Sequence, residues 1–402
     1  MIFKFKTVLK NHLFRRFSVV TFFDVSLVFF NYLFITSLTN WLSSEDYSNF
    51  SYFSSLSAVF FTLISFGSSN FIYRYVGKNN VNQVNLNSHI YVKLIIAIIS
   101  VIFILFLIKF DFLNGNLLII ALLSGLFISF NLGPFYDILS KTHKFSLLKL
   151  FTWLLVYGSV VILYLVNNEL SFNEVICGVI AFHFVFFLLS YISLRKHIAS
   201  EHSSTISVKD WFAKSKTFAL TSLISVIIDY VVLFSFKNST ENNVVAAIFI
   251  LIKLAVGLKT LDSSLQKVLI NKYKDKSPTS FFYKIVFVRI GILAIVVCSL
   301  VIANDYLYKL LEPSILMEIQ SLFPIWIIYM LSYVLNHFGT RLYVNGSIPV
   351  YLSINIVKIV LVLLLLCFDM LITKIDLNDF ILLVSLINIS EGFAFVYVTK
   401  KL

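Results

Sequence analysis

The sequence predicts an all-α integral membrane protein with twelve transmembrane helices, and its composition is the first observation that indicates this class. Of the 402 residues, 59% are hydrophobic and only 13% are charged, whereas a soluble domain has about 25% charged residues. So little charged surface cannot cover that many apolar side chains in water. The composition therefore excludes a soluble enzyme, a disordered protein and a disulfide-stabilised scaffold.

Twelve stretches are long and apolar enough for a membrane-spanning helix, which needs about 20 apolar residues to cross the hydrocarbon. In chain order they are 17–39, 50–73, 89–109, 114–136, 146–167, 171–194, 214–236, 243–268, 281–304, 320–344, 348–368 and 378–398. The first follows a basic start and has the length of a full span, so we expect it to be retained rather than cleaved as a signal peptide. Gly133-Pro134 in the fourth stretch predicts a kink.

The basic residues alternate from loop to loop as twelve spans require. Most of the 32 Lys and Arg residues lie in loops on the same side as the N-terminus, and the loops on the opposite side carry Lys109, Lys237, Lys309 and Lys374. Because cytoplasmic loops are enriched in Lys and Arg, we expect both termini to be cytoplasmic. The net charge of +12 is then a topology signal and a match to anionic membrane lipid, not a nucleic-acid site.

The loops are too short for a soluble catalytic domain. The longest, 195–213, is cytoplasmic and lies at the midpoint of the chain, which predicts a six-helix lobe over 1–197, a linker over 198–213 and a second six-helix lobe over 214–402. Low identity between the halves leaves open whether they are internal repeats. No G-x-x-x-x-G-K-[ST] sequence occurs and the three cysteines lack metal-ligand spacing. We expect no enzymatic activity, no cofactor and no metal.

The charged residues inside the expected spans include seven that we take as candidates for an interior site: Asp24, Asp229, Lys253, Lys259, Asp262, Arg289 and Lys358. Each would cost about 2.5–3.5 kcal/mol near a helix centre, so we expect them to line a shared polar interior. Lys253 is the first candidate for contacting an anionic group, because Gly257 lies one turn away on the same face and leaves room beside it. Arg289 and Lys358 are supporting candidates.

Salt bridges from these cations to Asp24 or Asp229 are the competing interpretation, since intramembrane charges commonly pair with one another.

Polar stripes on five spans favour the same interior. In the second span, small polar residues recur at helical spacing from Ser51 to Ser69, and three further stripes contain Asn31, Asn336 and Asn355. A stripe of this kind can also be a helix-packing surface, and for the second span alone that interpretation is the better one. Five stripes together, three of them with a charge, favour a hydrated cavity between helices.

Three regions also carry a resemblance to a known family. Within 43–76 an acidic-Tyr turn, a small-residue span and a Phe-Gly step precede a basic inner loop: Glu45-Asp46-Tyr47, Phe66-Gly67, Arg74 and Lys78. This stretch, together with 135–166 and 217–272, resembles polysaccharide flippases of the O-antigen type (Wzx-like) in the multidrug/oligosaccharidyl-lipid/polysaccharide (MOP) exporter superfamily. Ser48 departs from the family pattern, which usually has Gly there.

The resemblance implies two six-helix lobes around a central cationic cavity that opens alternately to the two sides of a bacterial inner membrane. It implies a flippase of lipopolysaccharide biosynthesis whose substrate is an oligosaccharide repeat unit on undecaprenyl pyrophosphate. A pyrophosphate needs fixed cations, a sugar needs polar side chains, and intramembrane carboxylates can bind a coupling H+ or Na+. The residues expected to bind substrate are Lys253, Arg289, Lys358, Asn31, Asn336 and Asn355, and those expected to bind the coupling ion are Asp24 and Asp229.

Two other functions compete with the flippase. An O-antigen polymerase or lipid-linked-sugar glycosyltransferase has a similar hydropathy profile, but such enzymes usually present a large outer loop, and here the outer loops are the short ones. A small-molecule exporter of the same superfamily is the second alternative. The intramembrane cations favour an anionic substrate over the small cations that such an exporter would carry.

Overall fold

The regular secondary structure of the described residues is entirely α-helical. The computed structural model describes residues 12–76, 81–109, 115–198, 206–216, 218–220, 242–257, 286–287, 289–291, 293–294, 297–298, 311–335, 348–371 and 377–401. Within these ranges, seven helices have the length and apolar composition to cross a membrane. The predicted class, an all-α multi-pass membrane protein, is therefore confirmed. The expected spans 214–236 and 281–304 lie largely outside the described residues.

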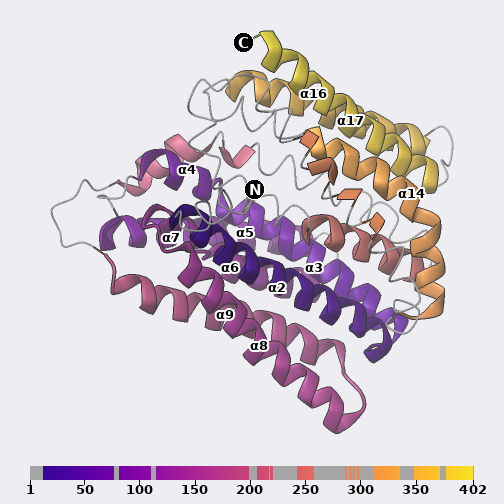
Figure 1. Ribbon diagram of the computed structural model, residues 1–402, viewed down its shortest axis with the longest axis horizontal. Helices are drawn as coiled ribbons and strands as arrows, with labels where there is room; N and C mark the ends of the chain where they lie inside the picture. Colours follow the sequence, from indigo (N-terminus) through magenta and orange to yellow (C-terminus); the bar gives the residue numbers. More distant parts are fainter. Residues whose placement is uncertain are drawn as a thin grey trace, which may run out of the picture. The chain divides into compact units, whose positions relative to one another are not determined.

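The chain divides into two compact units, one formed by residues 1–34 and 41–227 and the other by residues 35–40 and 228–402. The helices described in the first unit are α2 (His12–Trp41, except for residues 35–40), α3 (Ser44–Ser65), α4 (Ser68–Tyr75), α5 (Gln83–Lys109), α6 (Gly115–Ser129), α7 (Gly133–Ile138), α8 (Thr142–Asn167) and α9 (Phe172–Arg195). Figure 1 shows α8 and α9 running side by side as a pair. Aromatic rings join α2 to α8: Phe34 lies 4.6 Å from Tyr157 between ring centroids.

Helix α3 is the buried centre of the first unit and packs most extensively against α6. Ser51 and Ser55 on α3 are fully buried, and each hydroxyl donates to the backbone carbonyl four residues earlier at 2.8 Å. Gly125 on α6 permits the close contact, because a Cβ there would lie 3.0 Å from the carbonyl oxygen of Ser57. The buried serines of the polar stripe therefore bond to the backbone of their own helix, and α3 meets α6 at the turn that contains Ser57.

The second expected span, 50–73, is not one continuous helix. Its backbone turns at Phe66 (φ 47°) and Gly67 (φ 65°), which separates α3 from the short α4. A side chain at Gly67 would also collide with the chain passing beside it, since a Cβ would lie 2.6 Å from the backbone nitrogen of Ala219. Glycine satisfies both demands, the left-handed conformation and the close approach.

The fourth expected span is broken where the sequence predicts a kink. Helix α6 ends at Ser129 and α7 begins at Gly133, with Pro134 in its first turn, where a missing N–H costs no hydrogen bond. The side chain of Asn131 accepts the N–H of Gly133 at 2.9 Å. Lys93 of α5 donates to the carbonyl of Ser129, and so places a cation at the negative end of the α6 dipole.

Residues 206–216, which include part of the linker expected over 198–213, pack against the first unit. Trp211 is fully buried, and its ring lies 4.3 Å from that of Phe71 between centroids. The backbone N–H of Ile206 donates to the side chain of Asn85 at 2.7 Å. This segment is therefore held by both apolar and polar contacts.

The helices described in the second unit are Asn242–Gly257, α14 (Pro313–Leu335), α16 (Ile348–Leu371) and α17 (Leu377–Lys401). Helix α17 packs against both α14 and α16. The approach to α14 is close at Gly392, where a Cβ would lie 2.7 Å from that of Leu335. Trp326 of α14 donates its indole N–H to the carbonyl of Leu251 at 2.9 Å, and this bond fixes α14 against the helix Asn242–Gly257.

Candidate functional site

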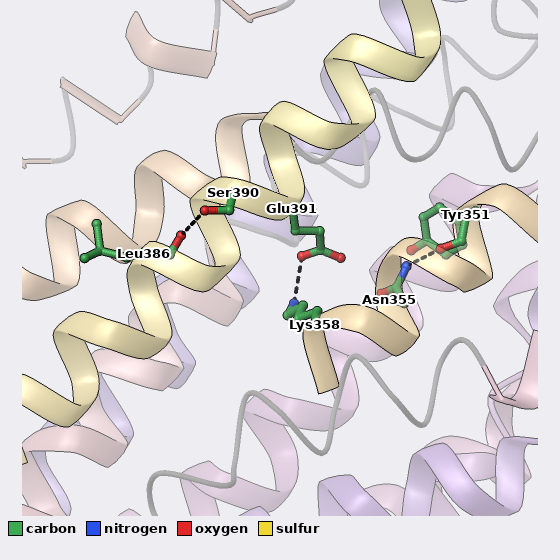
Figure 2. A network of polar contacts seen from close by, with 6 residues as sticks. All are labelled: Tyr351, Asn355, Lys358, Leu386, Ser390 and Glu391. Carbon is green, nitrogen blue, oxygen red and sulfur yellow. Dashed lines mark hydrogen bonds and ion pairs between the residues drawn. The ribbon is translucent and has the colours of Figure 1, made fainter. Parts of the chain in front are cut away.

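An ion pair between α16 and α17 is the centre of the candidate site. The Lys358 ammonium lies 2.8 Å from Oε2 of Glu391 (Figure 2), and the two residues are only 8% and 7% exposed. Each charge would be costly to bury alone, whereas a close pair in one hydrogen bond offsets much of that cost. The apolar helices of the second unit can therefore hold both charges.

The face of α16 that carries Lys358 is polar over two turns and lies against α17. Tyr351, Asn355 and Lys358 are spaced at i, i+4 and i+7, which places them on one side of the helix. The ring of Tyr351 stacks on that of Phe395 at 5.2 Å between centroids. The amide of Asn355, which is buried, donates to the carbonyl of Tyr351 at 2.8 Å (Figure 2).

The other two expected substrate-binding cations, Lys253 and Arg289, have an aromatic ring and a backbone carbonyl among their contacts. The Lys253 ammonium lies 4.9 Å from the ring centroid of Phe249, four residues earlier on the same helix, within the range of a cation–π interaction. Arg289 is buried and donates through Nη1 to the backbone carbonyl of Val334 on α14 at 3.2 Å.

In the first unit, Asp24 joins α2 to α8. It accepts a hydrogen bond from the Ser146 hydroxyl at 2.8 Å. Asn31 lies two turns further along α2 and is partly exposed. Asp229 and Asn336, the remaining expected site residues, lie outside the described residues. Among the six expected positions that the structure describes, Asn355 and Lys358 lie one turn apart on one face of α16.

Glu391 was not singled out by the sequence analysis, although the same criterion finds it. It is a carboxylate inside the apolar stretch 378–398, and the structure makes it the partner of Lys358 in place of the expected Asp24 or Asp229. His89 and Lys93 on α5 are two further titratable side chains that are buried inside an apolar stretch. His89 lies between the rings of Phe135 and Trp211. Among the described residues, no group of three His, Cys, Asp or Glu could hold a metal ion.

Comparison with known proteins identifies the fold. No protein-family model and no curated protein matches the sequence. Solved structures do match. An inward-facing multidrug resistance MATE transporter of the MOP superfamily has a TM-score of 0.64 at 12% identity, covering 92% of this chain and 93% of that one. An outward-facing one has a TM-score of 0.61 at 12% identity, covering 98% and 96%.

A MATE transporter from Vibrio cholerae also matches, with a TM-score of 0.54 at 11% identity over 98% of this chain and 97% of its own. The agreement extends over nearly the whole length of each protein, so it concerns the complete helical arrangement and not one local motif. The chain therefore has the fold of MATE transporters of the MOP superfamily.

Proposed function

We propose that the protein is a flippase that moves an oligosaccharide unit linked to undecaprenyl pyrophosphate from the cytoplasmic to the outer leaflet by ion-coupled alternating access. The observation that carries the proposal is the set of intramembrane cations on three helical segments of the second unit: Lys253, Arg289 and Lys358. Lys253 lies over the ring of Phe249, and Arg289 donates to the backbone carbonyl of Val334. Fixed cations of this kind match a phosphate-bearing substrate.

The fold supports the proposal at the level of mechanism. Both inward-facing and outward-facing transporters match this chain over more than nine tenths of its length, and two such states are what alternating access requires. Lipid-linked substrate, coupling by H+ or Na+ through Asp24 and Asp229, cytoplasmic termini and location in an inner membrane belong to the proposal. So does the division into lobes 1–197 and 214–402.

A small-molecule exporter is the second candidate, because the matching structures include transporters described as multidrug resistance proteins. The two functions differ in the charge they require. An exporter of cationic drugs gains from intramembrane carboxylates and is opposed by buried cations, whereas a lipid pyrophosphate needs those cations. A polymerase or glycosyltransferase is the third candidate and needs a catalytic site on an outer loop.

The sidedness of the lipid-linked sugar distinguishes the three. The experiment is deletion of the gene from its host. If the gene encodes a flippase, complete repeat units accumulate on the inner leaflet, whereas if it encodes a polymerase, single units are displayed outside. Loss of an exporter changes drug tolerance and leaves the polysaccharide intact. We expect inner-leaflet accumulation, and surface polysaccharide at the normal level in the deletion strain would contradict the proposal.

Matched lysine variants test the contribution of charge. Lys253→Ala is expected to abolish surface polysaccharide at normal protein level, Lys253→Arg to retain it in part, and Lys209→Ala to have no effect, because Lys209 is exposed on the segment 206–216. Normal display by the Lys253→Ala strain would remove Lys253 from the binding site. For the coupling ion, Asp24→Asn and Asp229→Asn should each reduce gradient-driven transport, and full activity in both would exclude these carboxylates.

A further inference from the structure

The Lys358–Glu391 pair lies next to an apolar groove between α16 and α17. The groove has a volume of about 420 Å³ and is lined by Leu361, Leu364, Leu365, Leu383, Leu386, Ile387 and Ser390. Leu361 follows Lys358 by three residues and Ile387 precedes Glu391 by four, so these two groove residues each share a helix face with one member of the pair, one turn away. Figure 2 shows Leu386 and Ser390 on the same stretch of α17 as Glu391.

The composition of this region is that of a site for an amphipathic anion. Leu361 and Leu386 are 44% and 46% exposed, so the groove presents leucine side chains on the outer surface of the helix pair. One helical turn from Leu361 lies Lys358, whose ammonium has three N–H donors and contacts Glu391 in the part of the chain that the structure describes. A hydrocarbon chain can pack against the leucine side chains, and a phosphate oxygen can accept a hydrogen bond from the ammonium.

We propose that Lys358 binds the phosphate of a lipid whose hydrocarbon chain lies in the α16–α17 groove, and that Glu391 takes up a proton when the phosphate binds. The inference rests on the proposed function, which supplies a lipid phosphate as substrate. It adds to that function the position of the chain and a proton acceptor other than Asp24 and Asp229.

The charge balance explains why a proton is needed. In the observed state the ammonium and the carboxylate cancel, so the negative charge of a phosphate entering beside them would be buried without a partner, which is costly. If the Glu391 carboxylate accepts a proton from water, its ion pair with Lys358 breaks. Lys358 keeps its own proton and donates it in a hydrogen bond to a phosphate oxygen, so the ammonium then pairs with one negative charge of the phosphate.

Among the described residues, the ion pair shown for Glu391 is the one with Lys358. Its neighbours on the other helices are as follows. On α16, the phenol of Tyr351 lies within electrostatic range of Glu391. On α14, the side chain that faces the neighbouring Gly392 is the apolar Leu335. The titratable groups of α14 with described side chains, Glu318 and Tyr329, precede Leu335 by about 25 Å and 9 Å along the helix axis.

Calorimetric binding to the purified full-length protein in detergent tests the proposal without requiring transport. The probes are undecaprenyl phosphate, undecaprenol and inorganic phosphate, and titration in two buffers of different ionisation enthalpy gives the protons taken up. We expect undecaprenyl phosphate to bind at least tenfold more tightly than either of the other probes. Wild-type protein should take up about one proton more per bound lipid than Glu391→Gln, which retains only the titration of the phosphate itself.

Variants separate the two halves of the site. Lys358→Ala should weaken binding of undecaprenyl phosphate at least tenfold at every pH. Leu386→Trp, which fills the groove, should weaken it similarly, while Leu363→Trp is the matched control, because Leu363 is exposed on α16 and does not line the groove. If Glu391→Gln does not fold, the buffer dependence of wild-type binding still measures proton uptake.

Equal proton uptake by wild-type protein and Glu391→Gln overturns the role of Glu391. Equal affinity for undecaprenyl phosphate and inorganic phosphate, or an unchanged affinity in Leu386→Trp, overturns the groove. Neither result would contradict the flippase function, which is tested by inner-leaflet accumulation in the deletion strain. Conversely, tight lipid binding in a protein whose deletion leaves sidedness normal would overturn the flippase and not this site.

Discussion

Gly125 offers a sharp test of the packing at the centre of the first unit. A Cβ at this position would lie 2.7 Å from Cβ of Phe60 and 2.8 Å from the backbone nitrogen of Phe61. Because carbon atoms pack best at about 3.5–4.0 Å, Gly125→Ala has to push α6 away from α3 by about 1 Å. The obstruction includes backbone atoms of a helix, so a side-chain rotation cannot relieve it.

The expected magnitude follows from two opposing effects. Overpacking costs about 1–3 kcal/mol, and replacing glycine by alanine inside a helix returns about 0.8–1 kcal/mol. Gly158→Ala on α8 is the matched control, because a Cβ there meets nothing within 4 Å and the variant gains the helix propensity alone. Gly125→Ala should therefore be less stable than Gly158→Ala by about 1–3 kcal/mol.

Reversible unfolding in SDS, followed by circular dichroism of the purified protein, measures this difference directly. The comparison removes the helix-propensity gain that both variants share, so it reports the clash alone. Equal unfolding midpoints for the two variants would refute the close packing of α3 on α6.

Two further predictions concern the ends of α9. Ser171 and Glu174 form a reciprocal capping box, so Ser171→Ala should lower the stability of α9 by about 1 kcal/mol. Hydrogen exchange in the first turn of α9 should become faster, and unchanged exchange would contradict the prediction. Partial desolvation and the nearby Lys141 and Lys144 lower the pKa of His197 from its ordinary value of 6.5. The folded protein then binds this proton less readily than the unfolded chain, so stability falls as the pH falls through 6.5. In the His197→Gln variant, the midpoint of thermal unfolding should depend less on pH between 7.5 and 5.5 than it does in the wild type. The same pH dependence in both proteins would exclude His197 as the cause.

The sequence shows that this is a membrane protein with many helices, because the scarcity of charge and the length of the apolar stretches act without regard to tertiary contacts. It also identifies Asn355 and Lys358 as neighbours on one face, since helical periodicity determines which side chains of a single helix lie together. The break at Gly133-Pro134 can also be predicted from the sequence, because proline restricts its own backbone and needs no tertiary contact to do so.

Tertiary structure decides which helix faces which. Periodicity places Lys358 on a side of α16 but carries no information on the neighbour, so the expected partners were Asp24 or Asp229 and the observed one is Glu391 of α17. The end of α3 at Phe66-Gly67 depends in the same way on the chain near Ala219 that passes against it. An ion pair and a close approach are properties of two segments together, and the energy of each exists only once folding has brought both to one place.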